Sequence, residues 1–343
     1  MMKRHKYTKV LYTKKPGGTP PQLVIAGDEN LQSKFVVQKV LELREQGVPL
    51  KDIAVLFRSS YLSFDLEIEL AKAAVPFLKF GGFKFIETAH IKDVIAYLRV
   101  LDNPRDVVAW NRILLLIEGV GPRTAEKVIE DILKRRVGAD RDTALQEFWL
   151  EYHAYPENVQ QLFTVLSKLV PESIPPPEKV VQIVQYYEPI FRSRYDDWNK
   201  RVKDLEMFEQ ISERYRAVSS FLTDLVLEPP NESVLDIVPP GKDEECLVLS
   251  TIHSAKGLEW HSVFIIYALD GRFPNSRAAY DEDEMEEERR LMYVACTRAK
   301  ENLFVAYPIN IYDRESGMIL SKPSRFVDGI DENLLEPWVI DEE

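Results

Sequence analysis

The chain has 343 residues, 45% of them hydrophobic, which is enough for two compact domains. Its formal net charge of −12 excludes a protein that attracts nucleic acid through an overall basic field, so any DNA contact must come from local patches and weaken with salt. The two cysteines, Cys246 and Cys296, exclude a dense disulfide framework and indicate a reducing compartment.

The first part of the chain alternates strand and helix patterns. Residues 1–21 are basic and then rich in Gly and Pro, without the apolar core of a signal peptide, and we interpret them as a leading segment. Short apolar runs predict strands, and apolar residues at helical spacing predict helices between them: strands at 23–26, 53–57 and 77–80, and helices at 30–46 and 62–74. The run at 53–57 is apolar throughout, as in strands buried on both faces of a parallel sheet.

The pattern changes at Gly81 and Gly82, after which a helix begins near Ile91. The chain then reads as helical almost to the return of the strand pattern: helices at 107–117 and 124–136, further helices within 143–227, a loop at 171–177 and a proline-rich linker at 228–242. Aromatic residues in this part, Tyr186, Tyr187 and Trp198, are interpreted as packing residues and not as base-stacking platforms.

A glycine-containing turn joins two of these helices. Gly119 and Gly121 lie between the helices predicted at 107–117 and 124–136. In a helix-hairpin-helix, such glycines let the backbone approach a DNA phosphate, which free N–H groups at the start of the second helix then bind. An ordinary αα-hairpin with a glycine turn has the same pattern. The residues alone leave the two interpretations equal.

The last part returns to strands, at 247–249, 263–269 and 303–306, with the polar cluster Thr251, His253, Ser254, Lys256 and Gly257 after the first. The acidic run 281–288 predicts a solvated helix start and not a metal site, and no metal site is predicted elsewhere. The helix places Arg298 on the face of Leu291 and Val294, so we expect a buried arginine, either in a structural Arg–Asp pair or facing an anion.

Two segments carry a resemblance. TIHSAKGLEW (251–260) and EEERRLMYVACTRAKENL (286–303) resemble motifs V and VI of UvrD/Rep/PcrA-type superfamily 1 DNA helicases. IAVLFRSS (53–60) is similar to a segment of that family in which an asparagine usually stands where Ser60 does. The stretch 81–101 resembles the exit into the family's inserted 2B domain, with Thr88 and His90 in place of the usual arginine and glutamate, so roles of those two side chains are not transferred.

The resemblance implies an α/β fold with a discontinuous RecA-like domain, 2A, at 1–80 and 244–343. An all-helical domain 2B, with the helix-hairpin-helix, would occupy 81–243. The sequence contains no G-x-x-x-x-G-K-[S/T], no paired acids of motif II and no motif IV signature, so it looks like the C-terminal, 2A–2B part of such a helicase.

The resemblance also implies roles for individual residues. Arg298 matches the arginine finger of motif VI, Glu259 matches the residue that reaches the ribose, and Gly257 permits the loop geometry. Single-stranded DNA contacts are implied for Arg58, Ser60, Thr251, His253, Lys256 and Asn275, the last standing where relatives often carry a histidine. In this family the hairpin is interpreted as a phosphate contact made by Gly119, Gly121, Arg123 and Lys127, with Arg112 nearby.

The function implied is that of the 2A–2B portion of an ATP-dependent 3′–5′ DNA helicase. Its cofactor would be ATP with Mg²⁺ in the full-length enzyme, with none tightly bound to this part. Expected partners are single-stranded DNA, single-strand/duplex junctions, the 1A and 1B domains, and repair or replication proteins. No apolar run approaches the length of a membrane span, which favours a cytoplasmic protein. The resemblance to DNA helicases implies association with the nucleoid.

Two alternatives stay open. The first is a non-catalytic DNA-binding or partner-docking protein that lacks the ATPase half. The second is the helicase part of a helicase–nuclease, against which counts the absence of any nuclease-like pattern after residue 327.

Overall fold

The computed structural model describes residues 19–82, 84–134, 155–226, 245–313 and 317–340. Most of the expected leading segment, the end of the predicted helix 124–136 and the proline-rich linker at 228–242 lie outside these residues.

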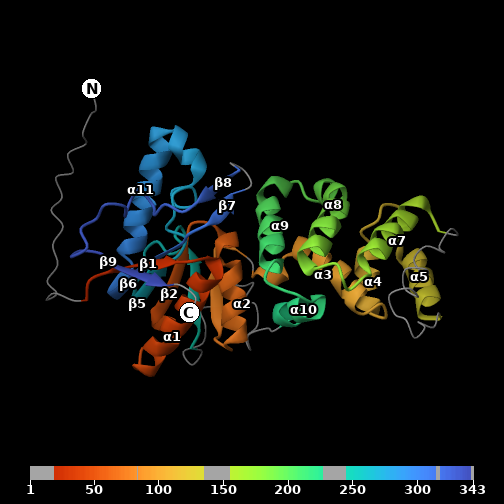
Figure 1. The fold of residues 1–343 in the computed structure, drawn as a ribbon, viewed down its shortest axis with the longest axis horizontal. Helices are drawn as coiled ribbons and strands as arrows, with labels where there is room; N and C mark the ends of the chain where they lie inside the picture. The colour runs from red at the N-terminus through yellow and green to blue at the C-terminus, as the bar shows by residue number, and fades with distance from the viewer. Residues whose placement is uncertain (1–18, 83, 135–154, 227–244, 314–316, 341–343) are drawn as a thin grey trace.

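A seven-stranded sheet forms one side of the molecule, and all its pairings are parallel (Figure 1). Its order is β3-β4-β2-β5-β6-β1-β9. The strands span β1 (Gln22–Ala26), β2 (Ile53–Phe57), β3 (Phe77–Phe80), β4 (Leu247–Thr251), β5 (Trp260–Ile265), β6 (Ala299–Pro308) and β9 (Glu336–Ile340). An antiparallel ribbon of β7 (Ile311–Asp313) and β8 (Met318–Leu320) stands apart from it. The predicted parallel α/β sheet is confirmed.

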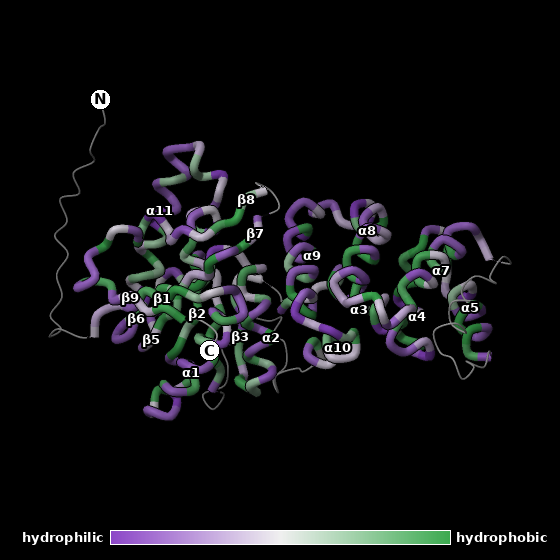
Figure 2. The backbone as a smooth tube through the Cα atoms, in the orientation of Figure 1, coloured by the Kyte–Doolittle hydropathy of each residue, from purple (hydrophilic) through white to green (hydrophobic). Residues whose placement is uncertain are grey.

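Strand β2 shows why the sheet needs helices on both faces. Val55 and Phe57 belong to the core under α1 (Glu29–Glu45) and α2 (Phe64–Lys72), whereas Ala54 and Leu56 belong to the core under α11 (Glu282–Cys296). Alternate side chains of a strand point to opposite faces, so a strand apolar at every position buries both of them. Figure 2 shows the hydrophobic positions concentrated along the strands.

The helical segment lies between β3 and β4. Its helices are α3 (Ala89–Asp102), α4 (Val107–Leu114), α5 (Pro122–Lys134), α7 (Glu157–Leu169), α8 (Pro176–Arg194), α9 (Trp198–Ser212) and α10 (Val218–Val226). They share one hydrophobic core, in which Tyr187 is fully buried and Tyr186 and Trp198 are partly buried, so the packing role predicted for these three is confirmed. α5 and α7 lie farthest from the sheet (Figure 1). In the described part of the chain, no helix is long and apolar enough to cross a membrane.

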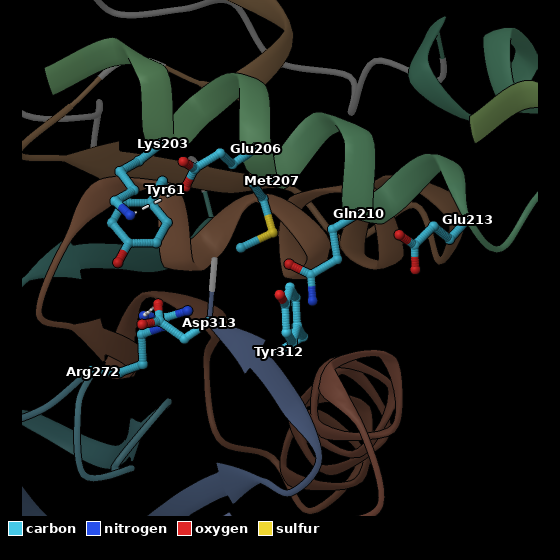
Figure 3. A pocket seen from close by; sticks show the side chains of 9 residues that line it. All are labelled: Tyr61, Lys203, Glu206, Met207, Gln210, Glu213, Arg272, Tyr312 and Asp313. Carbon is cyan, nitrogen blue, oxygen red and sulfur yellow. Dashed lines mark hydrogen bonds and ion pairs between the residues drawn. The ribbon is translucent and has the colours of Figure 1, made fainter. Parts of the chain in front are cut away.

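Charged side chains join the helical segment to the sheet side. Arg214, after α9, pairs with the buried Asp65 of α2, and Lys72 Nζ lies 2.9 Å from Asp224 Oδ2 of α10. A cavity of about 280 Å³ lies between α9, Tyr61 and β7, and Figure 3 shows the side chains that line it. Arg272 Nη1 donates to Asp313 Oδ1 there at 2.7 Å. These polar contacts accompany an apolar one, because Phe64 and Ile68 of α2 belong to the hydrophobic core of the helical segment.

Several predicted boundaries were wrong. The strand expected at 263–269 spans 260–265, the strand expected at 303–306 begins at Ala299, and the last helix ends at Cys296. α8 begins within the loop expected at 171–177, and β7, β8 and β9 were not predicted. Strand ends depend on hydrogen bonds with neighbouring strands, which apolar patterning does not report.

Glu29 gives a pH prediction. Burial and then the neighbouring Asp65 carboxylate raise the pKa of Glu29 to about 7 from its ordinary 4.5. The folded chain therefore binds a proton more tightly than the unfolded chain, and this contribution to stability is present below pH 4.5 and lost as pH rises to about 7. Wild type should lose on the order of 3 kcal/mol of unfolding free energy over that window beyond what Glu29→Gln loses, as measured by urea denaturation. Parallel pH profiles of the two proteins would contradict this.

Candidate nucleic-acid interface

The loops that follow β2, β3 and β4 meet at the carboxyl edge of the sheet. Arg58 and Ser60 follow β2, Gly81 and Gly82 follow β3, and Thr251 ends β4. A Cβ atom at Gly81 would lie 2.3 Å from Thr251 Oγ1, and one at Gly82 would lie 2.2 Å from Ser60 Oγ. The glycines therefore permit a close backbone approach that brings Ser60 and Thr251 to the same small area.

A buried ion pair holds the Ser60 loop. Lys79 Nζ lies 2.7 Å from Glu67 Oε1 and donates to the Ser60 carbonyl at 3.3 Å. The other oxygen of Glu67 accepts from the Phe85 backbone N–H at 2.8 Å. Lys79 and Glu67 thus connect the loop after β2 to the start of the helical segment. Neither was predicted, because each looks like an ordinary surface charge in its own element.

Arg58 and Asn275 share one carboxylate. Arg58 Nε and Nη2 lie 2.8 and 2.7 Å from Glu288 Oε1, and Asn275 Nδ2 donates to the same oxygen at 2.8 Å. Glu288 is 3% exposed, so the prediction that the acidic run 281–288 is solvated was wrong at its last residue. The signal was available: Glu288 lies three, four and seven residues before the buried Leu291, Met292 and Ala295.

The loop after β4 presents its polar groups outward. Thr251 Oγ1 donates to Ser254 Oγ at 3.0 Å, while His253 and Lys256 are exposed. His253 is therefore not a structural core histidine. Gly257 has φ +89, a conformation that side chains rarely adopt, which supports its predicted role in the loop's geometry.

Arg298 lies in the short turn between α11 and β6 and is half-buried. Its Nε donates to the Val294 carbonyl at 3.0 Å, Nη1 to the Leu258 carbonyl at 2.8 Å and Nη2 to Thr297 Oγ1 at 3.1 Å. Among the described residues no carboxylate pairs with it, so the described part of the chain supplies no partner for a structural Arg–Asp pair. Leu258 directly precedes the exposed Glu259. The hydrogen bond from Arg298 to Leu258 therefore brings together the segments 251–260 and 286–303, which carry the predicted nucleotide contact.

The glycine turn lies apart from this edge, between α4 and α5. Gly119 has φ +77, and both Gly119 and Gly121 face open space. Arg123 and Lys127, in the first turns of α5, are exposed. Arg112 does not join them, because its guanidinium bonds Asp93 Oδ1 at 2.7 Å and the Ala89 carbonyl at 2.9 Å. The structure thus presents two separate surfaces.

Comparison with known proteins decides the family. Residues 2–309 match the UvrD-like helicase C-terminal domain. The chain belongs to the UvrD-like helicase C-terminal domain family. It is 30% identical to the ATP-dependent DNA helicase PcrA of Staphylococcus epidermidis and 31% identical to that of Staphylococcus aureus, in each case over 96% of this chain and 46% of the relative. The chain therefore spans about half the length of these curated relatives.

The UvrD-like family accounts for the architecture. Its C-terminal domain is RecA-like with a helical insertion, and here helices α3 to α10 interrupt a parallel sheet between β3 and β4. The predicted resemblance and the α/β fold are confirmed. The division at residues 80 and 244 stays a prediction, as do the roles of the individual site residues.

Gly81 gives a prediction with a matched control. Gly81→Ala should lower the free energy of unfolding by at least about 1 kcal/mol more than Gly47→Ala, because only the first Cβ meets Thr251 and Ser254. Both glycines have positive φ, so the strain of that backbone conformation is common to the two variants. Denaturant unfolding of both measures the difference, and equal losses would show that the close approach is unimportant.

Proposed function

We propose that this chain is the 2A–2B portion of an ATP-dependent DNA helicase with 3′–5′ polarity. The observation that carries the proposal is the set of hydrogen-bond partners of the Arg298 guanidinium. Three of the five N–H groups of its guanidinium are used by the Val294 and Leu258 carbonyls and Thr297, and no described carboxylate neutralises it. One N–H on each terminal nitrogen remains for an anion, the geometry that suits a phosphate.

The nucleotide proposal combines Arg298 with the loop after β4. In the full-length enzyme ATP with Mg²⁺ would lie between this surface and the 1A domain, which supplies the phosphate-binding loop that this sequence lacks. Arg298 would stabilise charge on the transferring phosphoryl group. Glu259 is exposed and adjoins the Leu258 carbonyl that holds Arg298, a position from which it would meet the ribose. Gly257 gives this loop its geometry.

The DNA proposal concerns the carboxyl edge of the sheet. Arg58, Ser60, Thr251, His253, Lys256 and Asn275 would contact a single strand. Arg58, Ser60 and Asn275 line one cleft of about 920 Å³, and His253 and Lys256 are exposed on the adjoining loop. Because the net charge of the chain is −12, attraction of DNA must come from these local groups.

The second surface would contact duplex DNA. Gly119, Gly121, Arg123 and Lys127 lie at the start of α5, where open backbone and exposed cations suit phosphate binding without sequence readout. A single-strand/duplex junction is therefore the proposed substrate, with 1A and 1B and repair or replication proteins as further partners.

We also propose residues 1–80 and 244–343 as domain 2A and 81–243 as domain 2B.

Arg298 is tested in the enzyme completed by its 1A and 1B domains. Arg298→Ala should lower ATP turnover by about 10³-fold or more while nucleotide affinity changes far less, because the contact forms fully only in the transition state. Arg289→Ala is the control, since its side chain is 62% exposed on α11, the helix that precedes Arg298. Steady-state turnover and equilibrium nucleotide binding give the two values. Equal losses of both would contradict the role, and ATP turnover by the present chain alone would contradict the division of the active site.

The hairpin is tested by salt dependence. Arg123→Ala and Lys127→Ala should each weaken duplex binding and reduce the slope of log K against log salt by about 1. Lys134→Ala removes the same charge at the other end of α5, where the side chain is 68% exposed, and should leave the slope unchanged. Identical slopes in all three variants would favour the ordinary αα-hairpin.

A further inference from the structure

The Glu288 carboxylate joins three segments that are far apart in the sequence. Its Oε1 atom accepts hydrogen bonds from Arg58 at the end of β2 and from Asn275 in the loop after β5, while Glu288 itself belongs to α11. The carboxylate is buried, and its Oε2 atom has no hydrogen-bond partner among the described residues. One oxygen therefore carries the whole interaction.

These bonds orient the Arg58 guanidinium. Nε and one N–H of Nη2 are occupied by Glu288, which leaves both N–H groups of Nη1 and the second one of Nη2. The Arg58 side chain is 22% exposed and lines the cleft of about 920 Å³. An arginine without these bonds would sample many rotamers. Because the guanidinium is planar and is held through Nε and Nη2, the direction of its remaining N–H groups is already fixed before DNA binds.

The same carboxylate sets the Asn275 amide. Its Oδ1 accepts from the Ala278 backbone N–H at 3.0 Å, and its Nδ2 donates to Glu288 Oε1 at 2.8 Å. With the oxygen and the nitrogen each committed, one N–H of the amide remains for the cleft. Arg58 and Asn275 are thereby held in one fixed arrangement by a residue that is itself only 3% exposed.

We propose that Glu288 is a positioning residue that orients Arg58 and Asn275 for a phosphate of single-stranded DNA. The inference rests on the proposed DNA contact at this edge. It adds the buried Glu288 carboxylate, which fixes the orientation of the two side chains that would make the contact. The proposal predicts a change in DNA affinity opposite in direction to the change expected if Glu288 only repelled phosphate. Removing a negative charge beside a DNA site strengthens binding if the charge only repels phosphate, whereas removing a positioning carboxylate weakens binding.

The test measures binding of this chain to a labelled oligothymidylate at low salt by fluorescence anisotropy. Glu288→Gln keeps the shape of the side chain and should weaken binding about tenfold, because an amide oxygen accepts weaker hydrogen bonds from Arg58 than the carboxylate does. Glu287→Gln is the matched control, since it removes the same charge from the neighbouring residue, whose side chain is 57% exposed in the same cleft. The control should bind as tightly as wild type or slightly more tightly.

A double-mutant cycle checks that the effect passes through Arg58. In an Arg58→Ala background, Glu288→Gln should cost less affinity than it does in the wild-type chain, because only its effect through Asn275 remains. In ¹H–¹⁵N NMR of the DNA-free chain, the Arg58 Nε–H should exchange with water faster in Glu288→Gln and at the wild-type rate in Glu287→Gln. The dispersion of the backbone amide signals in the same spectra shows whether each variant is folded.

Two results would overturn the proposal in different ways. Equal affinities of Glu288→Gln and Glu287→Gln, with DNA bound by wild type, would reject positioning and leave the DNA contact standing. Absence of binding by the wild-type chain would reject the proposed DNA contact, and the positioning role with it.

Discussion

The parallel pairing of β4 between β3 and β2 is the constraint on which the site depends. Parallel strands end at one edge of a sheet, so the loops after these three strands must lie side by side. The close approach of Gly81 to Thr251 and of Gly82 to Ser60 follows from that pairing. The pairing of β3 with β4 also explains how a long helical segment can interrupt the chain: it leaves from one strand and returns to its neighbour, and the sheet stays continuous.

Buried charges specify the geometry around this edge. Lys79 pairs with Glu67, Arg58 with Glu288 and Arg214 with Asp65, and each pair joins two different elements of the chain. A buried ion pair contributes little net stability, because desolvation offsets the attraction, but removing one partner is costly. Such pairs therefore restrict how the elements dock.

The two arginines of the site are held in different ways. The Glu288 carboxylate neutralises Arg58 and fixes the orientation of its guanidinium. Backbone carbonyls and a hydroxyl hold Arg298, so it is positioned without losing its net positive charge. In the proposed role, Arg58 would contact the backbone of single-stranded DNA. An oriented arginine with full charge suits the concentrated negative charge of a phosphoryl group.

The sequence alone determined the parallel α/β class, the helical interruption after Gly82 and the motif residues, because apolar periodicity and local motifs are properties of short segments. The sequence predicted that Arg298 lies on a helix face, whereas the tertiary structure shows it in a turn, where it donates to the Leu258 carbonyl. It could show neither Lys79 under the Ser60 loop nor Glu288 between Arg58 and Asn275. Those contacts join segments whose proximity depends on strand order, and strand order arises from pairing across the whole sheet.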